Sequence, residues 1–194
     1  MRLFGGRRPA LPAAAGALEL AAGDRVLGWA QDATTGAYVV ASLHALHHLP
    51  GRTDGDAGTS AAAAAAAAPS ALGAGAAARW TRPWLDVAAG AWEPRTRTIT
   101  VTWADGSRPA MWSFVDDRVT FPAVLHDRVN ASVFVAVPVQ LGERNLGQVA
   151  LRKDLATGAL VEQVSLRRGA ASQDPEVAAY VQALLADLRE QAGL

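Results

Sequence analysis

The chain has 194 residues, of which 51% are hydrophobic, and its 18 Lys and Arg residues balance its 18 Asp and Glu residues. Because the formal net charge is zero, no overall electrostatic attraction draws it to nucleic acid or anionic lipid. The absence of cysteine excludes disulfides, thiolate nucleophiles and cysteine-based metal centres. No apolar run reaches the roughly 18 residues of a membrane span, and the N-terminal arginines precede no signal-peptide apolar region, so we expect a cytoplasmic protein.

The N-terminal residues 1–16 are rich in Gly, Pro, Ala and Arg. They predict a flexible tail ahead of a single domain over residues 17–194. Strands are predicted at 25–31 and 37–46, joined by a hairpin loop at 32–36 whose glycine suits a left-handed conformation. The stretch 51–78 is mostly small residues, with eight consecutive alanines, and has no apolar stripe on which a helix could dock. It therefore predicts a low-complexity, disordered insertion.

Five of the six tryptophans fall in the stretch from 80 to 115. Within it, residues 98–103 alternate β-branched or aromatic residues with threonine, a pattern typical of a half-buried strand. Residues 104–107 predict a tight turn that leads to a partner strand at 111–115. We expect four tryptophans to be core residues: Trp29, Trp84, Trp92 and Trp103. Trp80 lies between arginines, and we expect it to be partly exposed.

The C-terminal part predicts a short helix at about 121–133, strands at 134–137, 148–153 and 160–166, and a final amphipathic helix. The final helix has the clearest signals, because Asp174 can cap it, Pro175 suits its first position and Gly193 can end it. Its apolar residues recur at helical spacing, so one face must be buried: Val177, Val181, Leu184, Leu185 and Leu188.

Together the elements predict an α+β, mostly β fold, with an antiparallel barrel or roll of about seven to eight strands and a helix packed on it. Three phrases resemble bacterial pleckstrin-homology-like (PH-like) domain proteins of actinobacteria: residues 23–27 with 43–46, the Arg-Trp-x-x-Pro-Trp-Leu-Asp-Val phrase at 79–87, and the strand and Asp-Gly turn at 98–106. With the terminal helix, the resemblance covers about 18–49 and 79–115. It implies a PH-like barrel that the terminal helix plugs at one end.

Motifs for catalysis are missing from the sequence: there is no nucleophile elbow, phosphate-binding loop, dinucleotide-binding loop or HExxH motif. His44, His47 and His48 form the only histidine cluster, but His47 opposes the other two on a strand, so the three cannot converge well on one metal ion. Asp116 and Asp117 lie in a predicted turn, where solvation accounts for them. We therefore predict a protein without enzymatic activity, metal or cofactor.

Two non-enzymatic functions stay open. The first is a PH-like module that mediates protein–protein interaction along a sheet edge. The alternative is binding of a small apolar or aromatic ligand inside the barrel. Some PH domains bind phosphoinositides through basic residues of the first hairpin, but the loop at 32–36 has no basic residue. We therefore expect no strong phosphoinositide or membrane binding. The third hypothesis is an enzyme, and its best support would be metal binding by His44, His47 and His48.

Overall fold

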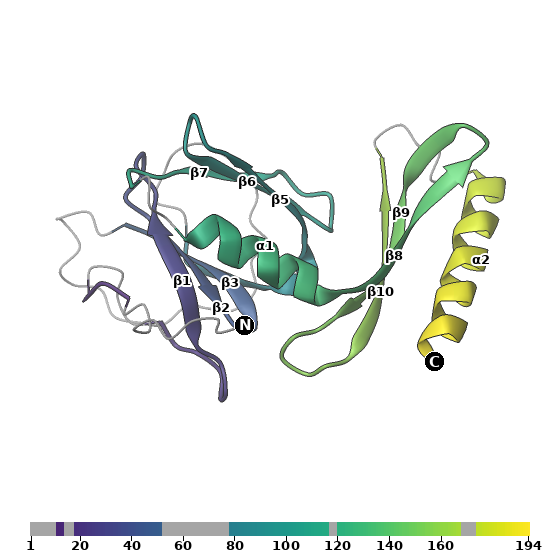
Figure 1. Cartoon of the computed structure of the whole chain (residues 1–194), viewed down its shortest axis with the longest axis horizontal. Coiled ribbons are helices and arrows are strands. Elements are labelled where there is room, and N and C mark those ends of the chain that lie inside the picture. The colour runs from purple at the N-terminus through teal and green to yellow at the C-terminus, as the bar shows by residue number, and fades with distance from the viewer. Residues whose placement is uncertain (1–10, 14–17, 52–77, 117–119, 168–173) are drawn as a thin grey trace, which may run out of the picture.

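A computed structural model describes residues 11–13, 18–51, 78–116, 120–167 and 174–194 (Figure 1). Most of the expected tail at 1–16 and nearly all of the expected insertion at 51–78 lie outside these residues, so both stay predictions. In the described residues, ten strands form three antiparallel sheets, and two α-helices accompany them. The mostly β, antiparallel class with a C-terminal helix is confirmed, whereas the count of seven to eight strands is wrong and the described strands form no closed barrel.

The first sheet contains four strands in sequential order: β1 (Val26–Gln31), β2 (Tyr38–Ser42), β3 (Ala45–Leu49) and β4 (Trp80–Pro83). The single strand predicted at 37–46 is therefore wrong, because a turn at 43–44 divides it. Side chains form this turn: Ser42 Oγ donates to Asp24 Oδ2 over 2.8 Å and accepts from the Ala45 N–H over 3.0 Å. The His44 N–H donates to the same carboxylate. Asp24 lies 18 residues before Ser42, so local sequence does not reveal this turn.

The second sheet follows a short 3-10 helix, η2 (Trp84–Asp86), and contains β5 (Val87–Glu93), β6 (Thr98–Trp103) and β7 (Ala110–Ser113). The strand predicted at 98–103 is confirmed with the same bounds. An isolated bridge between Asp32 and Phe114 joins the end of β1 to the end of β7. The first two sheets therefore enclose one core, with η2 at one corner and this bridge at another.

Helix α1 (Phe121–Ser132) packs against β5, β1 and η2. Its approach to β5 is close, because a Cβ atom added to Gly90 would lie 2.1 Å from Leu125 Cδ2. The predicted short helix at about 121–133 is thus confirmed. The helix that packs on the first two sheets is therefore α1, and not the terminal helix that the PH-like resemblance places at the end of the barrel.

The third sheet has the order β10-β9-β8 and contains β8 (Val133–Leu141), β9 (Arg144–Lys153) and β10 (Leu160–Leu166). Helix α2 (Pro175–Ala192) packs on β8 and β9. Its predicted ends are confirmed, because the Asp174 side chain accepts from the Glu176 N–H and Gly193 adopts a left-handed φ of 72°. No helix in the described ranges has the length and apolarity that crossing a membrane would require.

The elements form two lobes with separate cores (Figure 1). We call β1–β7 with α1 the N-terminal lobe, and β8–β10 with α2 the C-terminal lobe. The N-terminal core is rich in aromatic residues, and the C-terminal core is built from buried Val and Leu side chains. Among the tryptophans expected in the core, Trp84 and Trp103 are buried while Trp29 and Trp92 are half-buried. Trp80 is half-buried, as predicted.

The junction between the lobes is a buried arginine on β9. Arg152 is 1% exposed, and its Nη2 donates to the carbonyl oxygens of Trp84 and Val87 over 3.0 and 2.9 Å. Its Nε and Nη2 also donate to the backbone oxygen and the hydroxyl of Ser132, the last residue of α1. Gln163 on β10 accepts from Nη1 and donates to the Leu85 carbonyl. One guanidinium group thus ties β9 to η2, β5 and α1.

Candidate functional site

The structure separates the three clustered histidines. His44 lies in the turn before β3, not on a strand as predicted, and its Nδ1 is 3.9 Å from Asp24 Oδ1. His47 is buried and hydrogen-bonds to Thr81 Oγ1 and Ser42 Oγ, each over 2.9 Å. Among the residues that the structure describes, no group of three or more His, Cys, Asp or Glu side chains could hold a metal ion. The structure therefore offers no metal centre in this part of the chain.

His48 lies in an aromatic cluster. Its ring stacks on Trp80 at 5.5 Å between centroids and on Trp112 at 6.2 Å. Both ring nitrogens are buried without a hydrogen-bond partner. Burial lowers the pKa of His48 below its ordinary value, and the nearby Asp32 charge opposes that shift. Burial likewise lowers the pKa of His47, although the Asp24 charge raises it. Both imidazoles are therefore core groups of the N-terminal lobe.

The structure describes only one of the two adjacent aspartates at 116–117. Asp116 is exposed, and Asp117 lies outside the described residues. The space between the first two sheets is occupied by side chains, including Trp84, Val39 and Val101, each with 0% exposure. A ligand inside this lobe would have to displace them.

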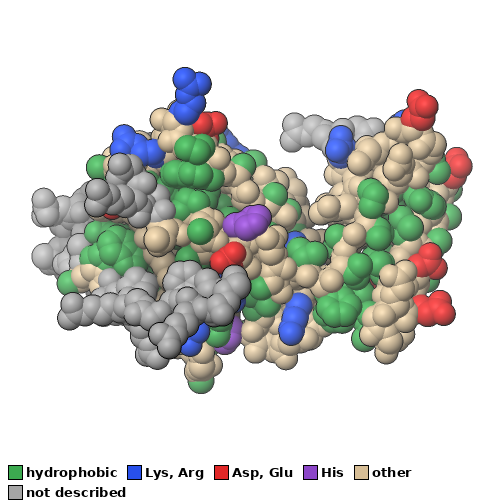
Figure 2. All heavy atoms as spheres, in the orientation of Figure 1, with side chains coloured by type: hydrophobic (Ala, Val, Ile, Leu, Met, Phe, Trp, Pro, Cys, Tyr) green, Lys and Arg blue, Asp and Glu red, His purple; other side chains and the backbone are tan. Residues whose placement is uncertain are grey.

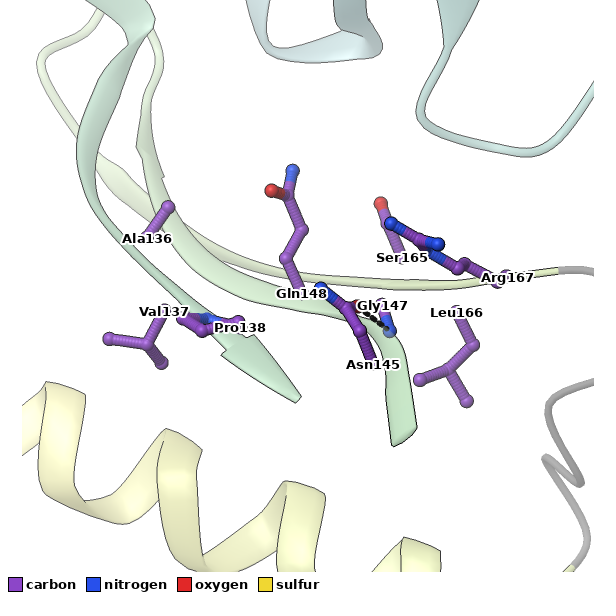
Figure 3. Close-up of a pocket in the computed structure, with 9 residues that line it drawn as sticks. All are labelled: Ala136, Val137, Pro138, Asn145, Gly147, Gln148, Ser165, Leu166 and Arg167. Atoms are coloured by element: carbon purple, nitrogen blue, oxygen red, sulfur yellow. Dashed lines mark hydrogen bonds between the residues drawn. The ribbon is translucent and has the colours of Figure 1, made fainter. Parts of the chain in front are cut away.

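A pocket lies on the C-terminal lobe, at one end of the β8–β10 sheet (Figure 3). Its volume is about 400 Å³, and its lining comes from all three strands. Ala136, Gln148, Ser165 and Arg167 extend from one face of the sheet in Figure 3, whereas Val137 and Leu166 point toward α2. The pocket therefore uses the face that α2 leaves open. Figure 2 shows the surface deeply indented between the two lobes.

Strand register explains why these side chains meet. Pro138 on β8 pairs with Gln148 on β9, and Gln148 pairs with Ser165 on β10, so the three lie in one row across the sheet. The residues at both ends of this row belong to edge strands. The strand predicted at 134–137 continues through Pro138 to Leu141, and Pro138 is tolerated because β8 is an edge strand of the described sheet.

Gly147 lets β9 and β10 approach each other closely at the pocket. A Cβ atom at this position would lie 2.1 Å from the Ser165 carbonyl oxygen, and the φ of 148° is one that side-chain-bearing residues rarely adopt. The Gly147 N–H donates to Asn145 Oδ1 over 3.1 Å, and a register shift lies opposite, between Val139 and Gln140. Glycine therefore brings β10 close to β9 beneath the pocket.

The lining has groups for binding but few for chemistry. Arg167 is its only ionisable side chain, and an arginine stays protonated. The lining contains no carboxylate, imidazole or thiol, and the Ser165 hydroxyl has no hydrogen-bond partner that could act as its base. General acid–base catalysis needs a group that gains and loses protons near neutral pH, which these residues do not provide.

The sequence did not predict this pocket, because its residues form no motif and come from three strands. The only local signals are a proline directly after the strand predicted at 134–137 and a glycine directly before the strand predicted at 148–153. Comparison of the chain with family models, with curated proteins and with solved structures finds no match in any of the three.

Proposed function

We propose that the protein is a non-enzymatic recognition module that binds an extended peptide segment of a partner protein at the β8–β10 pocket. The observation that carries this proposal is a pocket with hydrogen-bonding and apolar groups but without a general base or an activated nucleophile. Its volume of about 400 Å³ lies within the usual range of ligand sites. The pocket is therefore large enough for side chains of a bound segment.

A peptide suits this pocket because of the strands around it. β8 and β10 are both edges of the sheet, so their outward backbone groups can pair with an added strand. The exposed Ala136 and Pro138 provide an apolar surface, and the exposed amides of Asn145 and Gln148 can bond to a peptide backbone. Phe134 on β8 and Val161 on β10 are also exposed, at 55% and 42%, so both edge strands carry further apolar side chains outside the pocket lining.

We propose that the N-terminal lobe is a PH-like roll that serves as the scaffold. A four-stranded sheet, a three-stranded sheet and then α1 follow one another along the chain, and this order supports the resemblance. In this interpretation α1, rather than α2, takes the place of the closing helix. Phosphoinositide binding at the first hairpin finds no support, because Asp32 is buried there and accepts from the Ser113 and Thr35 N–H groups.

Selection from a library of short random peptides tests the proposed function. Immobilised wild-type protein should enrich related sequences. Ala136→Trp should remove most of the enrichment, because the exposed Ala136 lines the pocket and an indole at this position fills it. Ala156→Trp is the matched control, since Ala156 is also exposed but lies in the β9–β10 turn, outside the lining.

Three results would contradict the proposal. The first is enrichment no greater than that on an unrelated protein. The second is equal enrichment by the wild type and by Ala136→Trp, with both proteins folded by circular dichroism, because the peptides would then bind elsewhere. Turnover of any substrate that depends on this pocket would also oppose a purely binding role.

A further inference from the structure

We infer that the pocket selects a carboxylate on the bound segment and that Arg167 is the residue that holds it. This inference rests on the proposed function and specifies the chemistry of the partner. It concerns a site on the C-terminal lobe, away from the segments that resemble PH-like domains. Three observations support it: the charge of the lining, the unused donors in it, and the geometry of a guanidinium group.

The charge of the pocket comes from Arg167 alone. Arg167 is exposed, and it is the only charged residue in the lining. In the described ranges no carboxylate lies within 4.0 Å of its guanidinium group, since the ion pairs found there involve His44, Arg82 and Arg189. Arg189, on the opposite face of the lobe, is paired with Glu162. The pocket thus has a positive charge that no acid among the described residues neutralises.

The lining also has more free donors than acceptors. Asn145 Oδ1 already accepts from the Gly147 N–H, so the amide nitrogen is the free end of that side chain. The Ser165 hydroxyl is buried without a partner, next to Gln148 in the row across the strands. Arginine itself has five N–H donors and no acceptor. A ligand that only accepts hydrogen bonds, as an ionised carboxylate does, complements this set.

Geometry favours a carboxylate over a neutral acceptor. The planar guanidinium group presents two parallel N–H bonds, which match the two oxygens of a carboxylate. Figure 3 shows Arg167 on the same side of the sheet as Gln148 and Ser165, so a carboxylate at Arg167 lies within the pocket rather than beside it. The carboxylate can be the C-terminus of the partner or an Asp or Glu side chain, and both offer the same chemistry.

Four random peptide libraries test the inference and identify the source of the carboxylate. The first has a free C-terminus but no Asp or Glu, and the second has an amidated C-terminus with Asp and Glu. The third is amidated without Asp or Glu, and the fourth replaces these residues with phosphoserine. Each library is selected on wild-type protein, on Arg167→Gln and on the control Arg108→Gln, which removes an exposed arginine outside the pocket.

The expected result is enrichment from the first or the second library and none from the third. Fluorescence anisotropy with the enriched peptides should show binding at least about tenfold weaker for Arg167→Gln, because a charge-assisted bidentate pair is lost. Arg167→Lys should restore part of that loss through its charge. Arg108→Gln should bind as the wild type does.

The outcomes separate the two proposals. Equal binding of amidated, acid-free peptides to wild type and Arg167→Gln overturns the carboxylate inference while peptide recognition stands. Enrichment from the phosphoserine library alone also overturns it, because the site then selects phosphate. If no library is enriched by the wild type, the proposed function itself fails.

Discussion

The two lobes of the molecule solve the same packing problem with different residues. The buried core of the N-terminal lobe includes three tryptophans and two phenylalanines, and buried His47 and His48 lie within the same lobe. The described buried residues of the C-terminal core are all Val and Leu, and they include the apolar face of one amphipathic helix. Large polar-tipped side chains need specific partners, as when Trp84 Nε1 donates to the Ser42 carbonyl over 3.0 Å. Aliphatic side chains need only the right spacing and volume.

This difference gives a practical way to observe each lobe. All six tryptophans of the chain belong to the N-terminal lobe, so tryptophan fluorescence reports on it alone. The C-terminal lobe contributes α2, the longer of the two described helices, to far-ultraviolet circular dichroism. The two signals together show whether the lobes unfold as one unit or separately.

Breaking the junction should have the largest effect. Arg152→Met removes the guanidinium donors of the buried Trp84 and Val87 carbonyls, of which Trp84 keeps only the Val87 N–H, and we expect the free energy of unfolding to fall by about 4 kcal/mol. We expect the fluorescence and dichroism transitions in urea to coincide in the wild type and to separate in Arg152→Met. Lys153→Met is the control, because this neighbouring side chain is exposed. Coincident transitions in Arg152→Met would show that something else couples the lobes.

A cavity in the aliphatic core should have the next largest effect. Leu185 on α2 is 3% exposed, and Leu185→Ala should lower the free energy of unfolding by about 3 kcal/mol. In the wild-type background both signals should shift in urea, since Arg152 transmits the loss. In the Arg152→Met background only the dichroism transition should shift. A fluorescence shift in that double variant would contradict the assignment of separate cores.

The smallest expected effect is a pH dependence of stability that comes from the buried imidazoles of His47 and His48. Because burial lowers the pKa of His47 and His48, the unfolded chain binds more protons than the folded chain between the lowered values and about 6.5. Stability should therefore fall as the pH drops below about 7 and should be level above that, apart from other groups.

The substitution His48→Phe tests whether His48 contributes to this pH dependence of stability. It keeps a ring between Trp80 and Trp112 and removes two buried nitrogens that have no partner, so stability at about pH 7.5 should change by less than about 1 kcal/mol. The loss of stability toward about pH 5.5, measured by urea unfolding, should be smaller than in the wild type. An unchanged slope would show that His48 does not contribute.

Periodic patterns predict a helix or strand correctly where its bounds depend on its own residues and not on what it packs against. The strand at 98–103 and the strand at 160–166 have the predicted bounds, and the caps of α2 are formed by the predicted residues. The two Asp-x-x-Thr-Gly turns also share hydrogen bonds, since Thr35 and Thr157 each donate to the aspartate three residues before. These features depend on short-range chemistry that the sequence displays directly.

Long-range contacts were not predictable from local patterns. The apolar stripe of α2 predicts a buried face but not which sheet the helix covers, and the PH-like resemblance implies the end of a barrel, whereas α2 packs on β8 and β9. Arg152 occurs in a strand-end sequence, Leu-Arg-Lys, that usually faces solvent, and its partners lie 65 and 68 residues away. The pocket residues carry no motif, because strand register alone brings them together.

The buried guanidinium group of Arg152 also bears on the lifetime of the folded chain. Its hydrogen bonds require η2, the end of α1 and β9 to be in place together, and we expect contacts between such distant segments to form after the local ones. Interactions that are absent from the transition state slow unfolding without speeding folding. We therefore expect Arg152→Met to speed unfolding more than it slows folding, so that the folded chain has a shorter lifetime.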